Sequence, residues 1–471
     1  MVTTTERSPK RRLMKGGYTA RSGWGRLPAG TKRHCDENVG EIYRRIGSWL
    51  QENGAAFPSA MKLLWLCTAL FSSALCLQAE SRPNVIMIVS DDEGWGDIGW
   101  NNPEDRFYVN PICSVTRAAL MTGMHTLRTG VENFSGLDLK YQTLPQALKD
   151  AGYQTWMCGK WHLGGDRENR LSGPEYLPTA RGFDHHYGLL GGAVDYNTHM
   201  KPRTQELDWW RNGKPAEEKG YSTDLLANEA VGLIQKRDAG RPFFLYLAFN
   251  AIHGPISAPP GLGEEQKGRG RPTLLQAMTA LDAAAGRVLD ELDHQGIRKN
   301  TLVIFFSDNG GDLTKGSTNL TLREGKGTVF EGGIRVPAAI DWPDVLPSGK
   351  ISDQFLCVAD LFPTILDATG VKMGSAPNFD GKDVWPALKS GQTTDHPVYF
   401  MGNKEVAVFH SPWKLITSPR GQGSSPMLFD VVADPSEKTD VAGQHPEIVQ
   451  ELTERRGPGG GGKKRPSGPP A

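Results

Sequence analysis

The side chains best suited to chemistry follow three apolar runs that lie far apart along the chain. Asp91 and Asp92 come directly after the first run, His253 follows the second, and Asp308 and Asn309 follow the third. Carboxylate and amide oxygens suit a hard divalent cation such as Ca²⁺ or Mg²⁺, and no Cys/His set with zinc spacing accompanies them. One such Asp alone is most often a turn or helix cap, but three of them after strands favour a metal site.

A second candidate is the segment 113–123, CSVTRAALMTG, which predicts a helix beginning at a cysteine. A cysteine in the first helical turn lies at the positive end of the helix dipole, which favours the reactive thiolate. Arg117 lies one turn later on the same face. Taken alone, such a cysteine is more often a small buried hydrophobe, so the assignment depends on the rest of the chain.

Apolar, β-branched runs predict buried strands, and periodic stretches predict helices between them. The strands are expected at 84–89, 153–157, 243–249 and 301–306, and the helices at 144–150, 224–236, 274–292 and 360–368. This alternation predicts an α/β fold with a mostly parallel sheet covered by helices on both faces. Ligands of such sheets bind beyond the carboxyl ends of the strands, so the polar residues after each strand are expected at one edge.

The pattern changes beyond residue 374, where short strands and tight turns predict a small antiparallel sheet closed by a helix at 446–455. We therefore expect a catalytic domain at 84–373 and a C-terminal α+β subdomain at 374–456. Residues 457–471 are mostly Gly, Pro and Lys, which is typical of a disordered tail.

Residues 61–79 consist of Met61, one lysine, an apolar run of about 15 residues and small residues, the pattern of a secretory signal peptide. The run is short for a stable membrane span, which takes roughly 20 residues. We expect translation to start at Met61, with residues 1–60 a non-native upstream extension and the protein exported; the alternative is a genuine basic extension followed by a buried helix. Removing the leader leaves Cys113, Cys158 and Cys357, an odd number that argues against a disulfide framework.

The chain carries 53 Lys and Arg against 53 Asp and Glu, so its formal net charge is zero. The basic surplus lies in residues 1–60, and the remainder is mildly acidic. This distribution does not suggest a nucleic-acid partner.

Several short motifs occur together between residue 84 and about residue 455. They are SDD at 90–92 with GWGD at 94–97, the segment at 113–123, GKWHLG at 159–164, HGP at 253–255, SDNGG at 307–311, GKGT at 325–328, EGGIRVP at 331–337, and LFD at 428–430 with DPSE at 434–437. In combination they resemble the type I sulfatases, which have an alkaline-phosphatase-like fold. The segments 108–111, 159–164, 181–184 and 195–196 are more similar to the arylsulfatase B, or N-acetylgalactosamine-4-sulfatase, branch.

The resemblance implies that a formylglycine-generating enzyme oxidises Cys113 to formylglycine. The hydrate of this aldehyde would then attack the sulfur of a sulfated sugar or aryl sulfate. It also implies Ca²⁺, with Mg²⁺ possible, held by the following ligands: Asp91, Asp92, Asp308, Asn309 and the oxidised Cys113. His253 would donate a proton to the leaving alcohol, Lys160 and Lys326 would balance charge on the sulfuryl oxygens, and Arg117 and His162 would position the hydrate.

The chain departs from the family pattern at three places. Val115 stands where the family has Pro, and Thr116 where it has Ser or Ala. Only 20 residues separate Asp92 from Cys113, too few for the helix that the family places there. We expect this shortening to leave apolar surface uncovered beside the first strand.

Two alternatives stay open at this point. A phosphodiester or phosphonate hydrolase of the same superfamily would share the metal edge, but a two-metal, His-rich site would favour it over sulfate chemistry. A catalytically silent relative that binds sulfated glycans would be explained by Val115 and the missing helix.

Overall fold

The computed structural model describes residues 82–455 except for short gaps at 101–105, 132–134, 166–172, 262–269, 353, 375–377, 394–397, 402–404 and 419–424. The expected upstream extension, signal peptide and C-terminal tail lie outside the described residues. Within the described residues, no helix combines the length and apolar character that crossing a bilayer requires.

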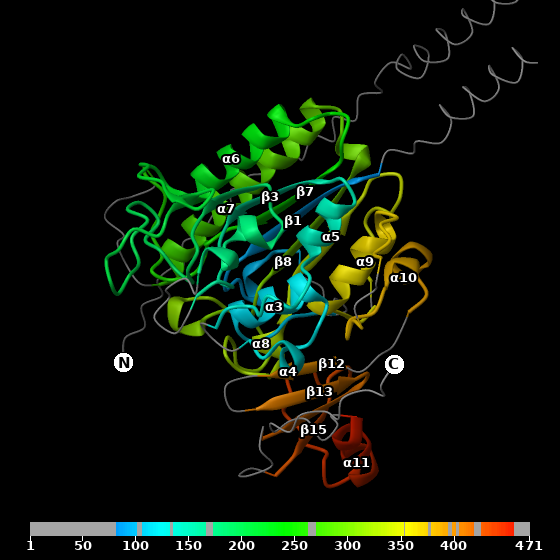
Figure 1. The fold of residues 1–471 in the computed structure, drawn as a ribbon. Helices are drawn as coiled ribbons and strands as arrows, with labels where there is room; N and C mark the ends of the chain where they lie inside the picture. The colour runs from blue at the N-terminus through cyan, green and yellow to red at the C-terminus, as the bar shows by residue number, and fades with distance from the viewer. Residues whose placement is uncertain are drawn as a thin grey trace, which may run out of the picture. The chain divides into compact units, whose positions relative to one another are not determined.

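An eight-stranded sheet forms the central layer, with the strand order β10-β8-β1-β7-β3-β4-β5-β6 (Figure 1). Five strands are parallel: β8 (Thr301–Ser307), β1 (Asn84–Ser90), β7 (Phe243–Ala248), β3 (Gln154–Gly159) and β4 (His185–Gly188). Antiparallel strands border them, namely β10 (Ala338–Asp341) on one side and β5 (Trp210–Arg211) with β6 (Lys214–Pro215) on the other. The predicted mostly parallel sheet is confirmed, and its antiparallel borders are additions that the sequence did not reveal.

Helices cover both faces of this sheet (Figure 1). One face carries α6 (Ser222–Lys236) and α7 (Arg271–His294), and the other carries α3 (Cys113–Thr122), α5 (Leu144–Asp150) and α9 (Leu361–Ala368). The alternation along β1 explains this, because Ile86 and Ile88 join the core under α6 and α7 whereas Val85, Met87 and Val89 join the core on the opposite face. Shorter helices are α4 (Thr126–Thr129), α8 (Glu331–Ile334) and α10 (Trp385–Ser390).

A three-stranded sheet in the order β11-β2-β9 leads into the cysteine helix. Its strands are β11 (Leu356–Cys357), β2 (Phe107–Tyr108) and β9 (Arg335–Val336). Strand β2 ends at Tyr108, five residues before Cys113, so its pairing with β9 and β11 fixes the direction from which the chain enters α3.

The C-terminal part forms the predicted antiparallel sheet. Its strands are β12 (Val398–Met401), β13 (Val406–His410), β14 (Trp413–Thr417) and β15 (Met427–Asp430), and α11 (Pro446–Arg455) closes it. Leu415 and Leu428 pack with Leu452 of α11, whereas Phe409 on the opposite face joins the main core and stacks on Phe355 with ring centroids 4.3 Å apart. The small sheet is therefore packed against the main core through apolar side chains.

Between β1 and α3, the described residues 93–100 and 106–112 contain a 3₁₀ turn at Trp95–Asp97 and strand β2, but no α-helix. We expected uncovered apolar surface beside the first strand. This prediction is wrong for β1 itself, because its seven residues are all buried. The apolar surface appears at its neighbour β8, where Phe305 is only partly buried. Trp100, 51% exposed, contacts that ring edge-on at 6.1 Å.

Candidate active site

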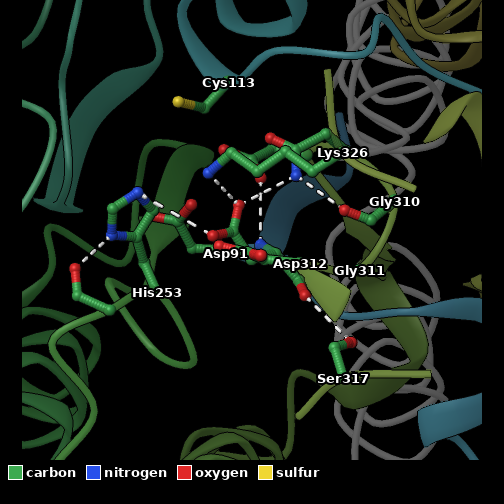
Figure 2. Close-up of polar contacts among 12 residues, drawn as sticks. Asp91, Cys113, His253, Gly310, Gly311, Asp312, Ser317 and Lys326 are labelled. Atoms are coloured by element: carbon green, nitrogen blue, oxygen red, sulfur yellow. Dashed lines mark hydrogen bonds and ion pairs between the residues drawn. The ribbon is translucent and has the colours of Figure 1, made fainter. Parts of the chain in front are cut away.

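The polar residues that follow the central strands come together at one edge of the sheet. Ligand atoms of Asp91, Asp92 and His253 lie within 4.8 Å of one another, and so do those of Asp91, Cys113 and Asp308. The strands β1, β7 and β8 are adjacent and parallel, so their carboxyl ends deliver these side chains to the same place. Figure 2 shows His253 and Lys326 approaching this group from two sides and Cys113 from a third.

Each of the three carboxylates has its own cationic partner. Lys160 Nζ lies 2.7 Å from Asp91 Oδ2, and Lys326 Nζ lies 2.5 Å from Asp92 Oδ1. The Arg117 guanidinium donates to Asp308 Oδ2 through both Nη2, at 2.7 Å, and Nε, at 3.1 Å. The pairing neutralises the cluster without closing off every carboxylate oxygen.

The electrostatic environment differs sharply between neighbouring carboxyl groups. Burial, followed by the nearby Asp308 carboxylate, raises the pKa of Asp91 to about 7. Burial also acts to raise the pKa of Asp92, but the Lys326 ammonium, which is the largest of several opposing influences, holds that pKa well below its usual range. Burial and the Asp308 charge destabilise the ionised form of Asp91, and a metal ion bound beside it would stabilise that form.

The donor set fits a hard metal ion. Asp91 Oδ1 and Asn309 Oδ1 are buried, and neither has a hydrogen-bond partner. The Asn309 amide nitrogen, Nδ2, donates to Asp92 Oδ1 at 2.8 Å, which leaves the amide oxygen available to bind a metal ion. Buried, unpaired oxygens are costly, and coordination to Ca²⁺ or Mg²⁺ would satisfy them. These two oxygens belong to the ligand set that the sequence predicted.

Cys113 is the first residue of α3 and is 4% exposed. Its Sγ lies 3.3 Å from His162 Nδ1. Burial raises the pKa of the thiol although Lys160 acts to lower it, so the thiolate expected from the helix dipole is not favoured. Burial and the neighbouring Lys160 also hold the pKa of His162 well below its usual range, which keeps the imidazole neutral.

Two residues of the site have backbones in the left-handed region that favours glycine. Asp92 has φ 66° and His162 has φ 56°. Gly192 lies so close to the His162 ring that a Cβ there would come within 2.9 Å of it. Such strained conformations persist where surrounding contacts enforce them, and they concentrate at functional sites.

Arg117 has two further contacts that the sequence did not reveal. Its Nη1 donates to the Lys160 carbonyl at 2.7 Å and to the Tyr246 hydroxyl at 3.1 Å. Tyr246 lies within β7, on the face that carries α3. Its position in an apolar strand gives no signal of a polar role, because only the packing of α3 on the sheet brings the guanidinium to it.

Thr116 fixes the backbone of the segment 108–112, which precedes Cys113. Its Oγ1 donates to the Asn110 carbonyl at 3.0 Å and accepts from the Asn110 backbone N–H at 2.9 Å. Val115 is 2% exposed and packs with Ile112 and Cys113 in a small apolar cluster. Both departures from the family motif are therefore accommodated in the folded chain.

Replacing Thr116 by valine should destabilise the protein by about 1–3 kcal/mol, because the buried N–H of Asn110 loses its acceptor. Thr116→Ser keeps the hydroxyl and serves as the matched control. Urea unfolding of both variants measures the difference. Equal stability of the valine variant and the wild type would show that the reciprocal bonds contribute nothing.

The site is accessible on the side of His253 and Lys326, whose side chains are each 22% exposed, whereas the other candidate residues are at most 5% exposed. His253 Nδ1 lies 2.7 Å from the Gly254 carbonyl, so it carries a proton and directs Nε2 toward Asp92 Oδ2 at 3.8 Å. A leaving group that departs to solvent would pass this face. The structure thus brings together all ten residues predicted from the sequence.

Comparisons with known proteins identify the family of the chain. The family model described as "Sulfatase" matches residues 83–371. The chain is 34% identical to mouse N-acetylgalactosamine-6-sulfatase over 409 residues, covering 76% of each protein. It is 29% identical to mouse arylsulfatase J over 455 residues, covering 80% of this chain and 75% of the relative.

Among solved structures, the crystal structure of Ps i-CgsB in complex with k-i-k-neocarrahexaose has a TM-score of 0.72 at 30% identity, covering 80% of this chain and 92% of that one. The family model spans well over half of the chain, and it includes Asp91, Cys113, His253, Asp308 and Lys326. The chain belongs to the sulfatase family of sulfuric ester hydrolases.

Proposed function

We propose that this protein hydrolyses sulfate esters of carbohydrates through a formylglycine made from Cys113. The observation that carries the proposal is the position of Cys113 Sγ, within 4.8 Å of ligand oxygens of Asp91 and Asp308 and 3.3 Å from His162 Nδ1. A nucleophile at this position faces a group of cations, which suits attack on the negatively charged sulfuryl group of a sulfate ester.

The chain's own residues divide the remaining tasks. Lys160 and Lys326 face the centre from two sides and would stabilise charge on the sulfuryl oxygens. His162 Nδ1, next to the Cys113 side chain, would hold the nucleophile through a hydrogen bond, and Arg117 would fix Asp308 beside it. His253, on the accessible side, would donate to the departing alcohol oxygen from Nε2 once it carries a second proton there. Burial lowers the pKa of His253 to about 3, and the Asp92 carboxylate acts to raise it.

A divalent cation would be held by Asp91, Asp92, Asp308, Asn309 and the modified Cys113. When bound, Ca²⁺ (with Mg²⁺ the other candidate) would supply positive charge that polarises the sulfate oxygens and acidifies the nucleophile. The orphaned oxygens of Asp91 and Asn309 support this assignment.

The substrate class follows from the relatives. N-acetylgalactosamine-6-sulfatase is named for a sulfated amino sugar, and Ps i-CgsB was crystallised with an oligosaccharide. We infer a sulfated sugar as the natural substrate, with aryl sulfates as convenient probes. The narrower resemblance to the N-acetylgalactosamine-4-sulfatase branch stays a prediction, as does export through the signal peptide at Met61.

Phosphoester or phosphonate hydrolysis is the second candidate. Within the described part of the chain, both groups of side chains that could hold a metal contain Asp91 and lie at one edge, and only one His belongs to them. A single centre with a cysteine beside it favours sulfate over the two-metal, His-rich alternative.

The deciding experiment is mass spectrometry of the peptide containing Cys113, from protein co-expressed with a formylglycine-generating enzyme. Conversion replaces CH₂–SH by CHO, a loss of about 18 Da. We expect conversion in the wild type and a higher yield in Val115→Pro, because proline restores the restricted backbone of the family motif. Folded protein with unmodified Cys113 in both variants would put the silent, glycan-binding alternative first.

A further inference from the structure

Lys326 lies in a glycine-rich segment, residues 323–333, which we call the Lys326 loop. It has no regular structure before the short helix α8. Gly325 approaches another part of the backbone so closely that a Cβ there would lie 2.5 Å from the Gly311 carbonyl oxygen. A loop of this composition has many accessible conformations when it is free. Holding Lys326 Nζ 2.5 Å from Asp92 therefore requires contacts from outside the loop.

The main domain supplies some of these contacts, since the Lys326 N–H donates to the Gly311 carbonyl at 3.2 Å. The C-terminal subdomain supplies others, and one of its residues contacts both ends of the loop. Glu437 Oε2 accepts the backbone N–H of Glu331 at 2.7 Å, and the Glu437 carbonyl accepts from Arg323 Nη1 at 3.0 Å. Glu437 is fully buried and has φ 51°. A glutamate held in the left-handed region, with side chain and carbonyl both bonded to one loop, is fixed by those contacts.

Lys414 of β14 supports the same arrangement. Its Nζ lies 2.6 Å from Glu437 Oε1 and 2.9 Å from Glu331 Oε1, and it donates to the Val329 carbonyl at 3.1 Å. Lys414 is fully buried. One ammonium group thus joins the subdomain to the middle and the far end of the Lys326 loop.

The Lys326 loop also contacts the segment 108–112, which precedes Cys113. Gly327 N–H donates to the Pro111 carbonyl at 2.8 Å, and the Tyr108 hydroxyl donates to Glu331 Oε2 at 3.0 Å. A shift of the loop would therefore move Lys326 relative to the helix that begins at Cys113.

Stability alone is a poor explanation for this cluster. Burying an ion pair costs much of what the pair gains, and well-packed apolar groups often serve equally well. What buried ion pairs add is a defined geometry, since each partner has one acceptable position.

We propose that Glu437 is a positioning residue for Lys326, so that the C-terminal subdomain sets the place of an active-site cation. This inference rests on the proposed role of Lys326 in the function above. Glu437 touches no reacting atom and acts only through the loop.

The test is a double-mutant cycle on the full-length, modified protein with para-nitrophenyl sulfate as substrate. Glu437→Ala should lower kcat by about 10–100-fold, because a displacement of about 1 Å at a charged group has effects of this size. Glu437→Gln keeps an acceptor for the Glu331 N–H and should fall in between. In a Lys326→Ala background, the Glu437→Ala change should cost nothing further in kcat, because the group it positions is gone.

Leu452→Ala is the matched control for stability. Leu452 is 1% exposed in the subdomain core with Leu415 and Leu428, so its truncation should lower the thermal midpoint without lowering kcat at a temperature well below it. An equal fall in kcat for Glu437→Ala in both backgrounds, or none in either, would overturn the inference alone. Full activity of Lys326→Ala would overturn the proposed role of Lys326 and the inference with it.

Discussion

Cys113→Ala will fold and will lose at least about 10⁴-fold in kcat toward aryl sulfate, because it removes the only group proposed to attack sulfur. The side chain lies in a small apolar cluster with Ile112 and Val115, where alanine fits, and the change removes the Sγ contact to His162 Nδ1 at 3.3 Å. Turnover of para-nitrophenyl sulfate, with circular dichroism to establish folding, measures the effect.

Cys357→Ala is the matched control, because Cys357 is also buried, at 1% exposure, but lies in β11 outside the site. It should lose a comparable amount of stability and retain turnover. Activity of Cys113→Ala within tenfold of the wild type would contradict the proposed nucleophile.

Asp308→Asn will lower activity by about 10²-fold or more and will abolish stabilisation by Ca²⁺. The asparagine still offers an oxygen to the Arg117 guanidinium, whose Nη2 donates to Asp308 Oδ2 at 2.7 Å, so the local packing is largely kept. The change removes one of three carboxylate charges from the proposed metal site. In the wild type, Ca²⁺ at one hundred times its dissociation constant should stabilise the fold by about 2.7 kcal/mol.

Thermal unfolding with and without Ca²⁺ measures this effect independently of activity. Asp360→Asn is the control, since Asp360 is fully buried and accepts from the N–H groups of Cys357 and Lys382, and it does not belong to either group of candidate metal ligands. It should unfold at a lower temperature but keep the rise on adding Ca²⁺. A full Ca²⁺-dependent rise in Asp308→Asn would remove Asp308 from the ligand set.

The sequence was sufficient to predict the central sheet and the convergence of its polar strand ends. The apolar runs that became β1, β7 and β8 are continuous, which distinguishes buried parallel strands from other elements. Because they are parallel neighbours, Asp91, His253 and Asp308 had to meet once the strands were identified. The helix ends at residues 150 and 455 were also predicted correctly.

The partners of the site residues could not be predicted in the same way. Tyr246 contacts Arg117 only because α3 packs over β7, and its place in an apolar strand gives no periodic signal. Glu437 and Lys414 lie in loop and strand positions that are usually solvated, so their burial depends on the docking of two sheets. Strand β4 was missed because four residues, HHYG, carry too little strand pattern.

The burial of Cys113 bears on when the protein becomes active. A side chain 4% exposed at the start of a packed helix cannot enter the active centre of another enzyme without opening the fold. The proposed conversion of Cys113 must therefore precede folding, and the two processes would compete for each newly made chain. A chain that folds first would stay inactive for as long as it stays folded. The fraction of active molecules would then be set by relative rates during synthesis, so slower folding or a more abundant modifying enzyme should raise specific activity without changing the folded structure.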